Sequence, residues 1–252
     1  MRKAIMAPRK ALITGAARRI GRATAEMLGR DGYQLALHSS ARSADETRAV
    51  AQMLAGKGVR ASVHIADLTQ PEAVRALFAE AARDGAIDLL INNASLFEPD
   101  GAHDFTDAGM MQHWAANLHA PCLLAQALAN QPQLEAGLVV NIIDQRVWRL
   151  NPEYFSYTLA KSALWTATRT MAQAFAPKVR VNGIGPGPVL ANKRQAPEDF
   201  AREAAATLLG REVGLDDITG AIAYLIGASR VTGQMIAVDS GQHLAWKTAD
   251  MV

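Results

Sequence analysis

The chain has 252 residues, half of them hydrophobic, and a formal net charge of +2. This length is enough to bury a substantial core, and because α/β proteins of this size often form one domain, we expect a single domain over residues 1–252. The basic residues are dispersed, which argues against a long basic tract for binding nucleic acid.

The cysteine content and the lengths of the apolar stretches indicate the cellular compartment. A single cysteine, Cys122, excludes an intrachain disulfide framework and fits a reducing compartment. No stretch reaches the roughly 18 uncharged apolar residues that cross a membrane, and no long apolar region follows the basic residues at the start. We therefore predict a soluble, cytoplasmic protein with no export signal, no membrane partner and no metal site.

Short apolar runs alternate with longer helical patterns along the chain. Strands are predicted at residues 11–14, 34–38, 61–65, 88–92, 138–143, 179–183 and 235–238. Because helical crossovers force parallel pairing, the predicted fold class is α/β: a Rossmann-type, doubly wound parallel sheet of about seven strands with helices on both faces. Ligands bind such sheets at the carboxyl ends of the strands.

The first predicted strand leads into a glycine-rich turn that ends in two arginines. Gly15 and Gly21 enclose Arg18, Arg19 and Ile20, and a helix is predicted to begin at the arginines. Cations at a helix N-terminus are opposed by the helix dipole, so we expect an anion to compensate them. Free backbone N–H groups would hold a pyrophosphate, and the arginines an additional phosphate. The alternative is a solvated basic helix start.

The end of the second predicted strand indicates which dinucleotide fits. An acidic residue there would bind a ribose 2′-hydroxyl and repel a 2′-phosphate. This chain has no acid at that point, where His38 is followed by two serines, Ala41, Arg42 and Ser43. Arg42 and the hydroxyls, joined by Arg18, favour a 2′-phosphate, so the predicted cofactor is NADP(H). The same segment would also serve as an N-capping loop before a helix.

Tyr157 and Lys161 lie in an amphipathic stretch at a spacing that places both side chains on one face of a helix. An adjacent ammonium favours phenolate, so Lys161 is expected to lower the pKa of Tyr157 and to suit it to proton transfer. Such a pair also arises by composition alone. Asp144, directly after an apolar strand, and Asn117, inside the helical stretch 110–128, support a catalytic group.

Taken together, these residues resemble the short-chain dehydrogenase/reductase family over nearly the whole chain. Further markers are Thr14, Asn92, Asn182 and the pair Pro186-Gly187. The resemblance implies that Tyr157 donates a proton, that Lys161 holds the nicotinamide ribose and that Asn117 helps to hold a relay water. The implied cofactor site comprises Gly15, Arg18, Arg19, Ile20, Gly21, His38, Arg42, Ser43, Asp67, Leu68, Asn93, Ala94, Ser95, Tyr157, Lys161, Pro186, Gly187 and Val189.

Two departures from the common family pattern resemble pteridine reductases. Arg19 stands where the family usually has glycine, and Asp144 where it usually has a serine before the tyrosine. This narrower resemblance implies that Phe97 stacks on a pterin, that Ser95 and Arg19 hydrogen-bond to pterin or cofactor, and that Asp144 acts with Tyr157 in proton delivery. The alternatives are that Phe97 anchors its loop and that Asp144 forms a cap or an ion pair near Arg146.

We therefore predict an NADPH-dependent reductase that transfers a hydride to a C=N or C=O carbon of a small molecule. The favoured substrate is a pteridine, a dihydropteridine or dihydrofolate. The alternatives are a general carbonyl or 3-oxoacyl reductase of the same family and a non-catalytic NADP-sensing regulator. The resemblance also implies a homotetramer, and the sequence assigns no role to Trp148, His243 or Trp246.

Overall fold

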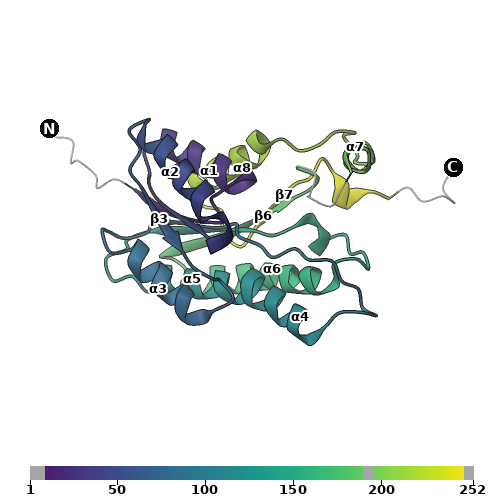
Figure 1. Ribbon diagram of the computed structural model, residues 1–252, viewed down its shortest axis with the longest axis horizontal. Coiled ribbons are helices and arrows are strands. Elements are labelled where there is room, and N and C mark those ends of the chain that lie inside the picture. The colour runs from purple at the N-terminus through teal and green to yellow at the C-terminus, as the bar shows by residue number, and fades with distance from the viewer. Residues whose placement is uncertain (1–8, 190–195, 247–252) are drawn as a thin grey trace.

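A computed structural model describes residues 9–189 and 196–246, which build one parallel sheet (Figure 1). The strand order is β3-β2-β1-β4-β5-β6-β7, and every adjacent pair is parallel. The strands are β1 (Lys10–Thr14), β2 (Gln34–Ser39), β3 (Ala61–Ile65), β4 (Leu89–Asn92), β5 (Gly137–Ile142), β6 (Val179–Pro186) and β7 (Met235–Val238). The order reverses between β1 and β4, which confirms the predicted doubly wound topology.

Helices cover both faces of the sheet (Figure 1). One layer contains α1 (Arg19–Arg30), α2 (Ala44–Ala55) and α8 (Leu215–Gly227). The other contains α3 (Pro71–Ala81), α4 (Asp107–Trp114), α5 (Ala120–Ala129) and α6 (Phe155–Phe175). A further helix, α7 (Pro197–Ala205), lies beside the turn that follows β7. Among the described residues, no helix is long and apolar enough to cross a bilayer.

Each face of the sheet has its own apolar core, because successive strand residues point to opposite faces. Ile13 and Leu37 pack on one side with Leu28 and Ile222. Leu12 packs on the other side, in a core that also contains Phe78 and Leu124. Burial of one such side chain stabilises the fold by about 1.5–3 kcal/mol. Strands buried on both faces read as continuous apolar runs, which explains why the sequence pattern located β1, β2, β4 and β5; the edge strand β3 is only partly buried.

The predicted ends of the strands lie within one residue of the structure except at β6, and one predicted helical stretch is interrupted. β6 continues from the predicted end at residue 183 to Pro186, because Gly185 and Pro186 pair in register with Ala237 and Val238 of β7. The apolar pattern of the sequence stops at Gly183, although the backbone pairing with β7 continues to Pro186. The predicted helical stretch 110–128 is interrupted by a π-helical turn, η2 (Ala115–His119), between α4 and α5.

Buried amide side chains join β4, β5 and α6 immediately below the carboxyl edge of the sheet. The Asn92 Nδ2 atom donates to Asn141 Oδ1 at 2.9 Å, and Asn141 Nδ2 donates to Thr168 Oγ1 at 2.8 Å. Asn141 and Thr168 are fully buried. The Thr168 hydroxyl in turn donates to the Leu164 carbonyl at 2.8 Å. The network fixes α6 against the two strands whose ends carry the site.

Replacement of Asn141 by leucine tests this network. The change leaves the Asn92 amide and the Thr168 oxygen short of a partner, and we expect the free energy of unfolding to fall by about 2–4 kcal/mol. Urea unfolding measures the loss. Thr170→Ala removes an exposed hydroxyl of the same helix and should stay within about 0.5 kcal/mol of wild type. Equal values for the two variants would contradict a stabilising network.

Candidate active site

The carboxyl ends of β1, β4, β5 and β6 border a cavity of about 440 Å³. Its wall contains most of the predicted site residues, namely Gly15, Arg18, Arg19, Ile20, Asn93, Ala94, Ser95, Phe97, Asp144, Tyr157, Lys161, Pro186, Gly187 and Val189. The other predicted residues, Gly21, His38, Arg42, Ser43, Asp67, Leu68 and Asn117, are not part of this wall. The fold thus gathers residues from distant parts of the sequence into one site.

The glycine-rich turn between β1 and α1 has the shape that a phosphate requires. Gly15 has a φ of +67°, and a Cβ atom there would lie 2.9 Å from the Ala94 Cα. Arg18 is the N-cap of α1 and makes no side-chain capping bond, so it does not compete for the first N–H groups of the helix. Arg19 has a φ of +51°, in the left-handed region that favours glycine. This backbone conformation costs about 1 kcal/mol or more for a residue other than glycine. The Arg19 side chain lines the cavity.

The residues predicted to bind a 2′-phosphate lie beside this turn. The Arg18 Nη2 atom donates to the Ser43 hydroxyl at 2.6 Å and lies 4.0 Å from the Glu46 carboxylate. Arg42 belongs to a short 3₁₀ turn, η1 (Ala41–Ser43), and its side chain is exposed. Ser43 is also the N-cap of α2, again with no side-chain capping bond. The segment thus caps α2 by its position, and the binding of a 2′-phosphate by its side chains stays a prediction.

His38 and Asp67 stabilise the loop after β3. The His38 ring is buried, and its Nε2 atom lies 3.2 Å from the Ala66 carbonyl oxygen. Burial lowers the pKa of His38 to about 4, so this imidazole is neutral at physiological pH. The Asp67 carboxylate accepts from the Thr69 backbone N–H at 2.9 Å and from its hydroxyl at 2.8 Å. A contact of either residue with a cofactor stays a prediction.

The segment after β4 is held on its other side by α4 and η2. Asn117 donates from Nδ2 to the Leu96 carbonyl at 2.8 Å and accepts at Oδ1 from the Leu96 N–H and the Ser95 hydroxyl. His113 accepts at Nε2 from the Glu98 N–H at 3.2 Å. The Asn117 amide is therefore committed to the loop, and its predicted part in holding a water remains a prediction. Sequence reasoning missed His113, whose spacing to Asn117 was the available signal.

Tyr157 and Lys161 are buried and form a polar cluster with the partly buried Asp144. The Tyr157 hydroxyl donates to Asp144 Oδ2 at 2.8 Å, and the Lys161 ammonium donates to the Ile142 carbonyl at 2.7 Å. Asp144 Oδ1 accepts from the Arg146 N–H at 2.8 Å and caps the 3₁₀ turn η3 (Gln145–Val147). Asp144 therefore forms the cap near Arg146 and also contacts the tyrosine, and its part in proton delivery stays a prediction.

The expected lowering of the tyrosine pKa is wrong for this geometry. Burial raises the pKa of Tyr157 well above its ordinary value, and the charge and hydrogen bond of Asp144 raise it further. Burial also raises the pKa of Asp144, against the opposing effects of Arg146, Tyr157 and Lys161. Burial lowers the pKa of Lys161 to about 8. Burial therefore favours the protonated form of both acids, and because the two groups share a hydrogen bond, their titrations are coupled.

Aromatic rings form a stack at the mouth of the cavity. Phe97 stacks on Tyr154 with ring centroids 4.1 Å apart and lies edge-on to Tyr157 at 4.7 Å. The Arg146 guanidinium lies 5.2 Å from the Tyr154 ring centroid. Tyr154 has a φ of +56° and is the N-cap of α6. One face of Phe97 is thus occupied by Tyr154, a contact that sequence reasoning did not anticipate.

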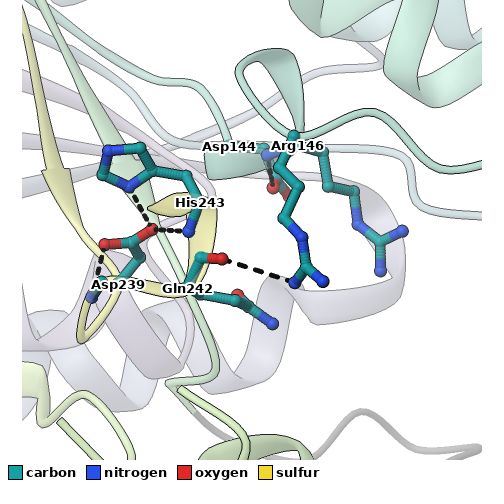
Figure 2. Close-up of polar contacts among 7 residues, drawn as sticks. Asp144, Arg146, Asp239, Gln242 and His243 are labelled. Atoms are coloured by element: carbon teal, nitrogen blue, oxygen red, sulfur yellow. Dashed lines mark hydrogen bonds and ion pairs between the residues drawn. The ribbon is translucent and has the colours of Figure 1, made fainter. Parts of the chain in front are cut away.

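The turn after β7 carries a carboxylate–histidine pair (Figure 2). The buried Asp239 carboxylate accepts from His243 N at 2.8 Å and from Gly241 N at 3.0 Å, and it lies 2.6 Å from His243 Nδ1. Trp148 packs against the His243 ring at 5.1 Å, and Trp246 is exposed. His243 and Trp148 thus stabilise a turn that borders the cavity. In the described part of the chain, no group of three or more metal-ligating side chains is found.

Comparison with known proteins places this site in a family. The family model described as enoyl-(acyl carrier protein) reductase matches residues 15–243. The FolM alternative dihydrofolate reductase 1 from Brucella canis, solved in complex with NADP, is 48% identical to this chain. Its structure superposes with a TM-score of 0.93, covering 97% of each chain.

Two curated relatives illustrate the range of substrates among similar chains. Pteridine reductase 1 from Leishmania tarentolae is 30% identical over 283 residues, which cover 93% of this chain and 96% of the relative. The cis-4-hydroxycyclohexanecarboxylate dehydrogenase of Sinomonas cyclohexanicum is 34% identical over 93% of this chain and 96% of the relative. Relatives of similar sequence identity thus have names that give chemically different substrates. The substrate class must therefore be argued from the site residues and not from overall identity.

The low pKa of Lys161 gives a pH-dependent prediction for the protein without ligands. Because burial disfavours the ammonium, we expect Lys161 to lose its proton near pH 8. NMR titration of isotope-labelled lysine ε-carbons measures this, and Lys161→Met identifies the resonance.

The same shift of the Lys161 pKa predicts how stability depends on pH. Between about pH 8 and the ordinary pKa of 10.5, the unfolded chain retains a proton on Lys161 that the folded chain has lost. The free energy of unfolding should therefore rise with pH in that window, relative to Lys161→Met. A midpoint near 10.5 would contradict the assignment.

Proposed function

The chain belongs to the short-chain dehydrogenase/reductase family, and we propose that it uses NADPH to reduce a dihydropteridine or dihydrofolate. The observation that carries the proposal is the Tyr157 hydroxyl, bonded to the Asp144 carboxylate and in edge contact with Phe97. The likeness to an alternative dihydrofolate reductase over nearly the whole chain supports it. The pteridine reductase relative supports it further.

The glycine-rich turn and its neighbours fit NADP(H). A Cβ atom at Gly15 would enter the Ala94 backbone, so the absence of a side chain keeps the floor of the turn open. The α1 N-terminus would bind the pyrophosphate, and Arg18, Arg42 and Ser43 would bind the 2′-phosphate. A structural neighbour with 48% identity is complexed with NADP, which supports the same choice here. When bound, NADPH supplies a hydride to the carbon of a C=N bond.

Tyr157 and Asp144 are proposed to deliver the proton that accompanies the hydride. Tyr157 retains its proton toward neutral pH because burial and Asp144 raise its pKa, so the hydroxyl is available as a general acid. For this step Asp144 would start as the protonated acid, a form that burial favours by raising its pKa. Its O–H would then donate along the 2.8 Å contact to the Tyr157 oxygen while the Tyr157 proton passes to the substrate, which leaves Asp144 as the carboxylate. Lys161 places a positive charge behind this pair and would hold the cofactor ribose.

Phe97, Ser95 and Arg19 are proposed to hold the pterin ring. The Ser95 hydroxyl and the Arg19 guanidinium line the same cavity as Phe97 and offer hydrogen bonds to the polar edge of a flat heterocycle. The general 3-oxoacyl reductase alternative has relatives in the family, including a Staphylococcus epidermidis enzyme of 26% identity. The Asp144 carboxylate, bonded to Tyr157 where that alternative would use a serine, favours the pteridine.

We also propose that the protein is a cytoplasmic homotetramer and that it does not bind nucleic acid. The solvent faces of α4 and α6 carry exposed apolar side chains, including Met111, Trp114 and Leu159, which would pack between subunits. The single cysteine is consistent with a reducing compartment. Light scattering at several protein concentrations measures the assembly.

The cofactor proposal predicts a selective effect of Arg42→Ala. Loss of a charge-assisted contact to the 2′-phosphate should raise the KM for NADPH about tenfold and change the KM for NADH much less. Steady-state kinetics with both cofactors measure the ratio. Arg48→Ala serves as the matched control, because Arg48 is an exposed arginine of α2 that pairs with Asp45. Equal effects of Arg42→Ala on both cofactors would remove the phosphate assignment.

The substrate proposal predicts that a change at Asp144 mainly affects kcat and that a change at Phe97 mainly affects KM. Asp144→Ser removes the carboxyl beside Tyr157 and should lower kcat for dihydropteridines about a hundredfold. The fall in kcat for any ketone that the protein reduces should be smaller. Phe97→Ala removes ring contact and should mainly raise the KM for pterins. A steady-state panel of dihydrobiopterin, dihydrofolate and an acetoacetyl ester measures both. Turnover of the ester without turnover of any pterin would leave only a general reductase.

A further inference from the structure

A second cavity adjoins the site on the side away from the glycine-rich turn. It measures about 630 Å³ and shares Phe97, Gln145, Arg146, Glu203 and Gln242 with the wall of the first cavity. Because five residues line both, a ligand seated against Phe97 can continue from one cavity into the other. A pterin ring alone would leave this second space to solvent.

Two arginines give the second cavity its positive groups. Arg146 donates from Nη1 to the Asn151 side chain at 3.0 Å, and Arg149 donates from Nη1 to the Gln242 carbonyl at 3.4 Å. Figure 2 shows Arg146 and Gln242 on facing segments at this point. Within the described residues neither arginine is ion-paired with a carboxylate, and each retains further N–H donors.

The acidic groups of the second cavity are mostly engaged elsewhere. Asp199 pairs with Arg202 of the same helix, and Glu203 accepts from Gln242 Nε2 at 3.0 Å. Glu153 is exposed. Two of the three acids thus already have partners, whereas neither arginine is ion-paired within the described residues, which favours an anion as the incoming charged group.

We infer that the second cavity binds the acidic tail of a folate-type substrate and that Arg149 binds one of its carboxylates. The inference rests on the proposed function and specifies its substrate class. Dihydrofolate carries a p-aminobenzoyl ring and a glutamate beyond its pterin, and a guanidinium binds a carboxylate in a two-point geometry that an ammonium does not match. The aromatic ring of the tail would pass Tyr154, which also lines this cavity.

The test compares two substrates that share the ring and differ in the tail: dihydrofolate and 6-methyl-7,8-dihydropterin. Arg149→Gln should lower the ratio of their kcat/KM values, dihydrofolate over the tail-free pterin, by about five- to tenfold. Arg149→Lys should restore only part of the ratio. Arg83→Gln, a change at an exposed arginine outside both cavities, should leave the ratio unaltered. A ratio unaffected by Arg149→Gln would overturn the inference.

A binding measurement separates this inference from the proposed function. Calorimetry with N-(4-aminobenzoyl)-L-glutamate should detect binding to the wild-type protein and at least fivefold weaker binding to Arg149→Gln. If neither pterin is reduced, the proposed function fails, while selective fragment binding still supports the anionic tail site. If both pterins are reduced but the fragment binds wild type and Arg149→Gln equally or not at all, the function stands and the tail site fails.

Discussion

The Thr14 side chain joins the two loops on which the site depends. Its hydroxyl donates to the Ile91 carbonyl and accepts from the N–H groups of Asn93 and Ala94, while Asn93 Nδ2 donates back to the Thr14 and Gly15 carbonyls. These bonds link the end of β1 to the end of β4. The glycine-rich turn and the segment that carries Ser95 and Phe97 therefore keep one relative position, as a cofactor and a substrate in contact with each other require.

The opposite side of that segment is held by a helix with a local defect. Asn117 lies in the π-helical turn η2 and His113 in α4 before it, and their side chains bind the backbone of Leu96 and Glu98. A π-helical turn shifts the side chains that follow it around the helix axis, and such turns are frequent at functional sites. The substrate-facing segment is thus bound on one side by a strand end and on the other by a helix.

The sequence was sufficient to predict the sheet and to name residues that mostly line one cavity, and it was insufficient to predict the electrostatics of that cavity. Apolar runs located the inner strands because both faces of a parallel sheet are buried there. The Tyr157 to Lys161 spacing correctly placed both side chains on α6. Helical spacing could not show that the tyrosine hydroxyl would be buried and would bond to Asp144, which comes from another part of the chain, so that its pKa is raised. The stack of Phe97 on Tyr154 likewise depends on a left-handed residue that no local pattern marked.

The raised pKa of Tyr157 has a chemical consequence for the choice of substrate. A tyrosine that is hard to ionise is a poor donor to a weakly basic ketone oxygen unless another group carries the negative charge that the proton leaves behind. In the proposed mechanism Asp144, starting as the protonated acid, would pass its proton to the tyrosine as the tyrosine donates to the substrate. The negative charge would then end on Asp144, beside the Arg146 backbone N–H and the Lys161 charge. A ring nitrogen of a pteridine is more basic than a ketone oxygen and accepts a proton from such a pair more readily. The carboxyl–phenol pair therefore favours C=N over C=O reduction.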